Sequence, residues 1–231
     1  MVRANDGGGV DAHTQIILDR YKGPQDVSVR HMSPDVLVDY YLKPVASPKE
    51  FRNKVILEIG AGCSQYIPVF LNAGCKRYYA NDLVSARLEV SRVDDPRYIE
   101  LPGDFRKVDI PETPDIIFAN LTMMMVIPML EEFVQRIADT LKPGGLFFSY
   151  DANYICPLSI WRRFADRKAN PVKLFNPFRY ANTFRQHGFE VEKLVPLTAR
   201  YPWTVGNWLL GTSFWLRARK NDYHHHPDVQ R

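Results

Sequence analysis

Short apolar runs that alternate with helical stretches are the feature that most restricts the fold of this chain. Their short connections favour neighbouring parallel strands covered by helices. After about forty residues without this rhythm, two further runs follow. The seven runs are Val55–Ile59, Arg77–Asp82, Tyr98–Leu101, Asp115–Ala119, Leu146–Tyr150, Phe189–Glu192 and Ser213–Arg219. We therefore predict an α/β fold: a Rossmann-like, doubly wound seven-stranded sheet, mostly parallel, with its last strand antiparallel.

The segments outside the strand pattern predict the boundaries of further parts of the chain. Ser33 can cap a helix, Pro34 suits its first turn and Pro44 ends it, which predicts a helical lid before the sheet. The expected divisions are a Gly-rich mobile leader (1–12), a helical lid (13–50), the α/β domain (51–220) with an insertion that shapes the substrate site (151–187), and a polar tail (221–231).

Composition places the chain among ordinary globular proteins. Hydrophobic residues make up 45% of its 231 residues, enough to fill a core and to exclude wholesale disorder. The three cysteines form no CxxC pair, which favours a reducing compartment over a disulfide scaffold. The N-terminus lacks the apolar segment of a signal peptide, and no apolar stretch is long enough to span a membrane. A cytoplasmic location is the expectation.

The net charge of +4 is unevenly distributed along the chain. Residues 1–50 carry 6 basic and 7 acidic groups, and residues 51–150 carry 11 and 13. Residues 151–231 carry 13 basic and 6 acidic groups, so the whole basic excess lies in the last third. This excess favours an anionic substrate or an anionic surface as its partner, although a solvated face has the same composition.

A glycine turn after the first strand carries the clearest chemical signal. Glu58-Ile59-Gly60-Ala61-Gly62-Cys63-Ser64 leads from this strand into a helix, whose free N–H groups suit a carboxylate or phosphate. Asp82 ends the next strand, where an acidic residue can bind ribose hydroxyls. A dinucleotide or a sulfonium nucleoside fits this pattern. The dinucleotide fingerprint fails because Gln65 stands where it needs its third glycine.

With these motifs, residues 50–220 resemble the class I S-adenosylmethionine-dependent methyltransferases. Glu58, Gly60 and Gly62 match the family's acidic-x-GxGxG motif, with Ser64 at the third glycine. Further likenesses follow in the family's order. They are Gly103-Asp104-Phe105, Asn120-Leu121-Thr122, Leu141-Lys142-Pro143-Gly144-Gly145-Leu146 and Arg185-Gln186-His187-Gly188-Phe189.

The resemblance implies S-adenosylmethionine as cofactor and assigns its contacts. The glycine turn with Ala61 would hold the methionine part, Asp82 the ribose hydroxyls, and Leu83 would pack on adenine. Asp104 and Phe105 would form the adenine site, with the Asp104 carboxylate accepting from the exocyclic amine. Asn120 and Leu121 would face the transferred methyl group.

Departures from the family narrow the chemistry. The motif at Asn120 is not the Asn/Asp-Pro-Pro-aromatic signature of members that methylate planar nitrogens, so no nucleic acid partner is expected. Metal-dependent members place Asp at this position and an Asp-Asn pair after the fifth strand. Asn120 and Asp151-Ala152-Asn153 match that pattern poorly, so no metal is expected.

Methyl transfer needs a general base only when the acceptor must lose a proton. Candidates are His31, beside the lid helix, and Asp151, at the tip of strand five; an exposed loop residue and a helix cap are their plain interpretations. For acceptor binding, we expect aromatic and basic residues of the insertion, because ligands bind at the carboxyl ends of such strands. These are Tyr154, Trp161, Arg162, Arg163, Arg179 and Tyr180.

The sequence therefore predicts methylation of a small molecule, with O-methylation of an acidic or aromatic acceptor preferred. Methylation of an isoprenoid quinone or a lipid-linked precursor, with peripheral membrane contact through the insertion, is the second interpretation. A catalytically silent binding module is the third. The sequence does not indicate an oligomeric state.

Overall fold

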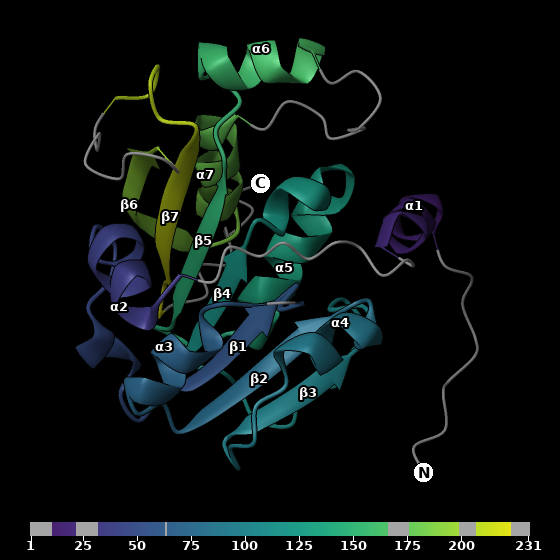
Figure 1. The fold of residues 1–231 in the computed structure, drawn as a ribbon, viewed down its shortest axis with the longest axis vertical. Coiled ribbons are helices and arrows are strands. Elements are labelled where there is room, and N and C mark those ends of the chain that lie inside the picture. Colours follow the sequence, from purple (N-terminus) through teal and green to yellow (C-terminus); the bar gives the residue numbers. More distant parts are fainter. Residues whose placement is uncertain (1–10, 22–31, 63, 166–175, 199–206, 223–231) are drawn as a thin grey trace, which may run out of the picture.

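A computed structural model describes residues 11–21, 32–62, 64–165, 176–198 and 207–222. A seven-stranded sheet forms its centre, in the order β3-β2-β1-β4-β5-β7-β6 (Figure 1). Strand β7 runs antiparallel to both of its neighbours, whereas the pairs from β3 to β5 are parallel, which confirms the predicted sheet. The strands are β1 (Val55–Ile59), β2 (Arg77–Asp82), β3 (Tyr98–Pro102), β4 (Ile116–Asn120), β5 (Leu146–Ala152), β6 (Phe189–Leu197) and β7 (Ser213–Lys220).

The central strands are apolar on both faces because helices cover both sides of the sheet. Every residue of β1 is buried, and β5 is buried up to its last residue. Among the described residues, five α-helices of six residues or more follow strands, and one precedes the sheet. They are α1 (Ala12–Tyr21), α3 (Ile67–Asn72), α4 (Ser85–Ser91), α5 (Leu130–Thr140), α6 (Pro157–Ala165) and α7 (Pro177–Gln186).

Two hydrophobic clusters lie on opposite faces of the sheet. On one face, α3 packs among aromatic rings around the fully buried Trp215, whose ring centroid lies 5.2 Å from that of Tyr150 and 5.9 Å from that of Phe118. On the other face, α5 and α7 contribute side chains such as Phe184, which stacks on Phe147 at 4.7 Å. Side chains at alternate strand positions supply the two clusters.

The predicted lid divides into two parts that lie in different places. A short helical segment follows the expected cap: Ser33 accepts the Val36 N–H, and α2 (Pro34–Val36) continues into a π-helix, η1 (Leu37–Leu42). Leu37 and Leu42 are buried in the cluster around Trp215, so this part is core rather than lid. Only α1 lies apart from the sheet, on the side of α4 and α5 (Figure 1).

The described part of the insertion after β5 forms two helices, α6 and α7. Asn153 donates its side-chain amide to the carbonyls of Trp208 and Gly211, which joins the end of β5 to the turn before β7. Asn176 then caps α7, accepting the N–H groups of Phe178 and Arg179. These contacts gather α6, the start of α7 and the 207–211 turn at the edge of the sheet where β5 ends (Figure 1).

Three further short helical turns complete the described elements. They are η2 (Pro48–Phe51), η3 (Met123–Met125) and η4 (Ile127–Met129). The two latter turns connect β4 to α5 and follow the segment Asn120-Leu121-Thr122. Within the described ranges, no helix has the length and apolar character needed to cross a bilayer.

Candidate active site

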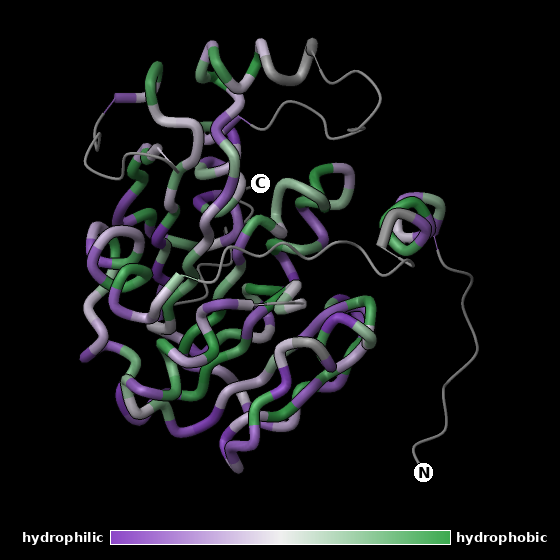
Figure 2. The backbone as a smooth tube through the Cα atoms, viewed as in Figure 1, coloured by the Kyte–Doolittle hydropathy of each residue, from purple (hydrophilic) through white to green (hydrophobic). Residues whose placement is uncertain are grey.

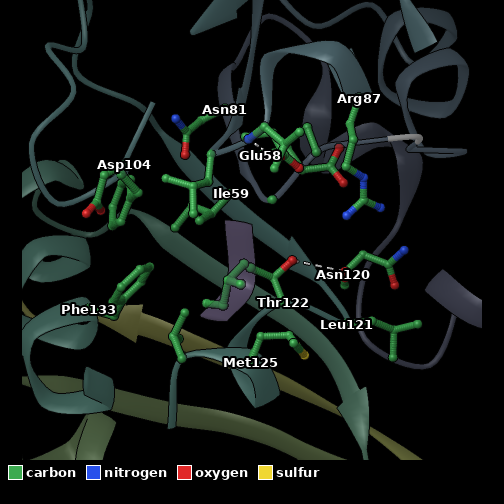
Figure 3. Close-up of a pocket in the computed structure, with 18 of the residues that line it drawn as sticks. Glu58, Ile59, Asn81, Arg87, Asp104, Asn120, Leu121, Thr122, Met125 and Phe133 are labelled. Atoms are coloured by element: carbon green, nitrogen blue, oxygen red, sulfur yellow. Dashed lines mark hydrogen bonds between the residues drawn. The ribbon is translucent and has the colours of Figure 1, made fainter. Parts of the chain in front are cut away.

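A cavity of about 410 Å³ opens at the carboxyl ends of β1, β2 and β4. Its volume falls in the range of small-molecule sites. Figure 3 shows Asp104 and Phe133 at one end, Arg87, Asn120 and Leu121 at the other, and Glu58 between them. The residues of the sequence motifs that line it are Glu58, Gly60, Ala61, Asp82, Leu83, Asp104, Phe105, Asn120 and Leu121. Gly62 belongs to the same turn but is not part of the cavity wall.

Three carboxylates reach the cavity wall from successive strands. Glu58 is fully buried, and desolvation by burial raises its pKa well above the usual range. Burial also raises the pKa of Asp82, although the Val84 N–H that it accepts at 2.8 Å favours the charged form. Asp104 is less buried and pairs with Arg106 at 2.6 Å. A ligand with positive or hydrogen-bond-donating groups would meet these acids.

One carboxylate oxygen of Glu58 can accept a hydrogen bond from a ligand. The Tyr78 hydroxyl donates to its Oε2 atom, and the Ser64 side chain also favours the charged form of Glu58, whereas its Oε1 atom is buried without a hydrogen-bond partner in the described part of the chain. Leaving a buried acceptor unsatisfied costs about 1 to 3 kcal/mol, and more for a charged group. An unsatisfied carboxylate oxygen in a cavity wall is therefore suited to a cationic donor.

The glycine turn needs glycine because another strand end packs against it. Gly60 has φ +68°, and a Cβ there would lie 2.3 Å from Thr122 Oγ1. Leu121, beside Thr122, has φ +54°, a conformation that costs a residue with a Cβ about 1 to 3 kcal/mol. The Tyr150 carbonyl holds it by accepting the Leu121 N–H at 2.7 Å. This hydrogen bond holds the segment between β4 and η3 in the cavity wall despite the strain.

Helix α1 closes part of the cavity and is tied to it at two points. Arg106 donates to the carboxylates of Asp104 and Asp11 at 2.6 Å each, and to Thr14 Oγ1 at 3.0 Å. The Arg106 partnership is the main reason that the pKa of Asp11 lies below its usual range. The His13 Nε2 atom lies 2.7 Å from the Met125 carbonyl oxygen. Thr14 therefore enters the cavity wall from the predicted lid.

The wall beyond Asn120 is neutral. It is formed by Leu121 and Thr122, followed by Met124, Met125 and Val126 of the connection to α5. None of these side chains carries a group that titrates near neutral pH. An acceptor bound against this wall would thus meet positioning contacts rather than a proton-accepting side chain.

Asp151 lies behind this wall rather than in it. Its side chain is fully buried, and its Oδ1 atom accepts the Met124 N–H at 3.2 Å. Burial raises its pKa to about 8, so it holds a proton at neutral pH. The base role inferred from its place at the tip of strand five is therefore corrected: Asp151 supports the turn that carries Met124.

Tyr180 is likewise corrected. It is buried in the core of α7, and its hydroxyl lies 2.9 Å from Ser149 Oγ, so it cannot stack on an acceptor ring. Trp161 and Arg179 are exposed on α6 and α7, and Tyr154 packs partly buried against the core. His31 and the side chains of Arg162 and Arg163 lie outside the described residues.

The sequence interpretation missed the two cavity arginines and the contacts that join α1 to the cavity. Arg106 stands two residues after Asp104, a spacing that could have indicated a local ion pair. Arg87 reaches the cavity from α4, and its guanidinium lies 3.1 Å from the position of a Cβ at Gly62. No sequence signal indicated that contact. No group of three His, Cys, Asp or Glu side chains suited to a metal occurs in the described ranges.

Comparisons with known proteins agree with this site. A family model described as a methyltransferase domain matches residues 57–149. Malonyl-[acyl-carrier protein] O-methyltransferase of Chlorobium luteolum is 35% identical over 99 residues, 40% of this chain and 37% of that protein. A probable protein arginine N-methyltransferase 6.2 of Oryza sativa subsp. indica is 29% identical over 121 residues, 49% of this chain and 31% of that protein. Residues 57–149 therefore resemble a methyltransferase domain.

The curated relatives are longer, since the chain spans only about a third of their length. Solved structures match more of it. A possible histamine N-methyltransferase from Thermotoga maritima has a TM-score of 0.67 at 18% identity, covering 90% of this chain and 100% of that one. Magnesium protoporphyrin IX methyltransferase from Synechocystis with bound S-adenosylhomocysteine has a TM-score of 0.62 at 11% identity, with the same coverage. These likenesses show the methyltransferase fold.

The methyltransferase cofactor, S-adenosylmethionine, fits the groups in the cavity wall. It carries an ammonium group suited to a buried acceptor such as Glu58 Oε1, and ribose hydroxyls suited to a carboxylate such as Asp82. The bare backbone at Gly60 allows the close approach that a ligand of this size needs. When bound, the cofactor supplies a methyl group already activated by a sulfonium.

Replacing Gly60 with alanine tests the close contact in the methyltransferase glycine turn. Because a Cβ at Gly60 would collide with Thr122, we expect the Gly60→Ala variant to lose affinity for S-adenosylhomocysteine by roughly tenfold or more. Gly188→Ala is the matched control, since Gly188 has φ +80° but no atom within 4 Å of a Cβ. Titration calorimetry measures both. Wild-type affinity in Gly60→Ala would show that the turn is not the binding element.

The buried Asp151 predicts a pH effect on the stability of the methyltransferase domain. In the unfolded chain this carboxyl ionises near pH 4, whereas the folded state keeps its proton up to about pH 8. Folding takes up a proton between these values, so this group's contribution to stability falls as pH rises. In urea unfolding at several pH values, Asp151→Asn should gain stability over wild type between pH 4 and pH 8. Asp94→Asn, which removes an exposed carboxylate, is the control; an equal gain there would contradict the account.

Proposed function

We propose that the protein is an S-adenosylmethionine-dependent methyltransferase that forms methyl esters on the carboxylate of a small acidic molecule. One observation carries the proposal. The cavity is lined by three carboxylates, Glu58, Asp82 and Asp104, and beyond Asn120 by side chains that cannot accept a proton near neutral pH. The carboxylates suit the cofactor, and the wall beyond Asn120 suits an acceptor that needs no deprotonation.

The proposed cofactor contacts follow the order of the strands. The turn from Gly60 to Gly62 holds the methionine part, and Glu58 Oε1 accepts from its ammonium group. Binding of a cation there would lower the raised pKa of Glu58 and keep its carboxylate charged. Asp82 binds the ribose hydroxyls.

The adenine end involves two residues from the segment after β3. Asp104 accepts from the exocyclic amine while Arg106 holds its carboxylate in place. Phe105 is buried beside Phe133, at a centroid distance of 5.8 Å, and together they form an apolar floor for the base. Leu83, at the end of β2, packs on the other side of the base. Arg106 thus links the adenine end to α1.

The nature of the acceptor follows from the chemistry of the transfer. Displacement at an activated methyl carbon requires alignment of the acceptor and exclusion of water, and positioning of this kind supplies about 7 to 11 kcal/mol. A hydroxyl acceptor would also need a base. A carboxylate is already deprotonated at neutral pH, so the neutral wall beyond Asn120 suffices.

The charge of Arg87 and the name of one curated relative both support a carboxylate acceptor. Arg87, whose charge also favours the ionised form of Asp82, lies on the same side of the cavity as Asn120 (Figure 3), and a carboxylate bound there would also interact with it. The Chlorobium luteolum relative is named for O-methylation of a malonyl group. Of the expected acceptor residues, five remain candidates for the surface that an acidic acceptor contacts as it approaches the cavity. They are Tyr154, Trp161, Arg162, Arg163 and Arg179.

An activity screen tests the proposal. The protein is incubated with methyl-labelled S-adenosylmethionine and pooled aliphatic and aromatic carboxylic acids. We expect labelled products that release methanol in mild alkali, because methyl esters hydrolyse there, and a rate that stays constant above the pKa of the acceptor. Gly60→Ala should lose most of this activity, and Asp94→Asn should keep it.

Label in alkali-stable products would contradict the proposed acceptor. Label on amines would favour nitrogen methylation, as the rice and Thermotoga maritima proteins are named for. No label with any acceptor, despite bound S-adenosylhomocysteine, would favour a silent binding module.

A further inference from the structure

Five large apolar side chains gather at the edge of the sheet where β5 ends. Leu158 and Trp161 lie on α6, Phe178 on the first turn of α7, and Leu209 and Leu210 in the turn before β7; each is between 45% and 65% exposed. We call these five residues the apolar patch. Among the described residues, only two other large apolar side chains, Ile16 and Tyr40, are exposed to this extent. Scattered single exposures are normal on protein surfaces, but a group on one edge marks an interaction site.

Side-chain contacts join the elements that carry the patch. The Phe178 ring lies 4.9 Å from the Trp208 ring, between centroids, which connects the start of α7 to the turn before β7. Asn153 binds the carbonyls of Trp208 and Gly211 and directly precedes the segment leading into α6. Figure 1 shows α6 and the start of β7 at the same end of the molecule, and Figure 2 shows hydrophobic colour on both.

The patch and the cavity share one edge of the sheet. Strands β1, β2, β4 and β5 run parallel, so their carboxyl ends point the same way. The cavity opens at the ends of the first three, and the apolar patch lies at the end of the fourth. A surface that contacts the patch would therefore face the side on which an acceptor approaches.

The sequence around the patch is strongly basic. Between residues 157 and 187 it has seven basic residues and one acidic residue, Asp166. The basic residues are Arg162, Arg163, Arg167, Lys168, Lys173, Arg179 and Arg185. Aromatic and leucine side chains beside arginines are the combination that places a segment in the interface of an anionic bilayer. Docking of a second copy in a symmetric dimer would instead bring two basic segments together.

We propose that the apolar patch docks the protein on an anionic lipid surface, with Trp161 and Leu209 inserted between headgroups, and that the positive charge of this part of the sequence attracts it to lipid phosphates. The acceptor is then a carboxylic acid with an apolar tail, taken from that surface. This choice of acceptor rests on the proposed function, whereas docking itself does not.

Vesicle sedimentation tests the docking. Wild-type protein should sediment with vesicles of phosphatidylcholine and phosphatidylglycerol at low salt, bind pure phosphatidylcholine vesicles much less, and detach as salt rises. Trp161→Glu and Leu209→Glu, on separate elements, should each reduce binding by roughly tenfold or more. Tyr40→Glu is the matched control, because Tyr40 is 49% exposed on η1 outside the patch, and it should bind like wild type.

Several results would overturn the proposal. They are wild-type protein that stays in solution, patch variants that bind like wild type, and equal binding to neutral vesicles. A patch variant that halves the particle mass in light scattering would assign the patch to a second copy instead. Capture of an acidic protein in place of vesicles would also contradict it.

Titration with S-adenosylhomocysteine separates docking from the site chemistry. The two patch variants should keep wild-type affinity, which shows that they are folded. Wild-type protein that binds vesicles but not S-adenosylhomocysteine would contradict the proposed function and leave the docking supported.

Discussion

The contact between Gly60 and Thr122 is the constraint on which the rest of the site depends. It brings the turn after β1 against the end of β4, with no room for a side chain between them. Leu121 is held with a positive φ beside this contact, and Glu58 is buried directly before it. Because the two strand ends meet here, one cavity spans both.

Burial sets the electrostatics of this cavity. Glu58 and Asp82 both have raised pKa values because desolvation disfavours their charged forms, and a bound cofactor would provide the missing donors. Arg106 compensates Asp104 and ties α1 to the same end. In the proposed site, the adenine end and α1 therefore share one ion-pair cluster, while the wall beyond Asn120 carries no proton-accepting side chain.

The sequence predicted the features that depend on local patterns, namely the strands and the residues at their ends. Alternating apolar runs located all seven strands, and strand ends located Glu58, Asp82 and Asp104, because residues there meet at one edge of a parallel sheet. The sequence did not predict how segments that are distant in the chain pack together. The burial of Tyr180 and Asp151, the division of the lid and the reach of Arg87 depend on such tertiary contacts. Charge counting found the basic last third, but only the fold showed that an apolar patch accompanies it.

Titration of Asp82→Asn with S-adenosylhomocysteine tests most directly whether this cavity is the cofactor site. The substitution keeps the size of a side chain that is 6% exposed and removes its charge. We expect affinity to fall by roughly tenfold or more, the cost of losing charge-assisted hydrogen bonds, while Asp94→Asn binds like wild type. Equal affinity in wild type and Asp82→Asn, with both folded, would contradict the assignment.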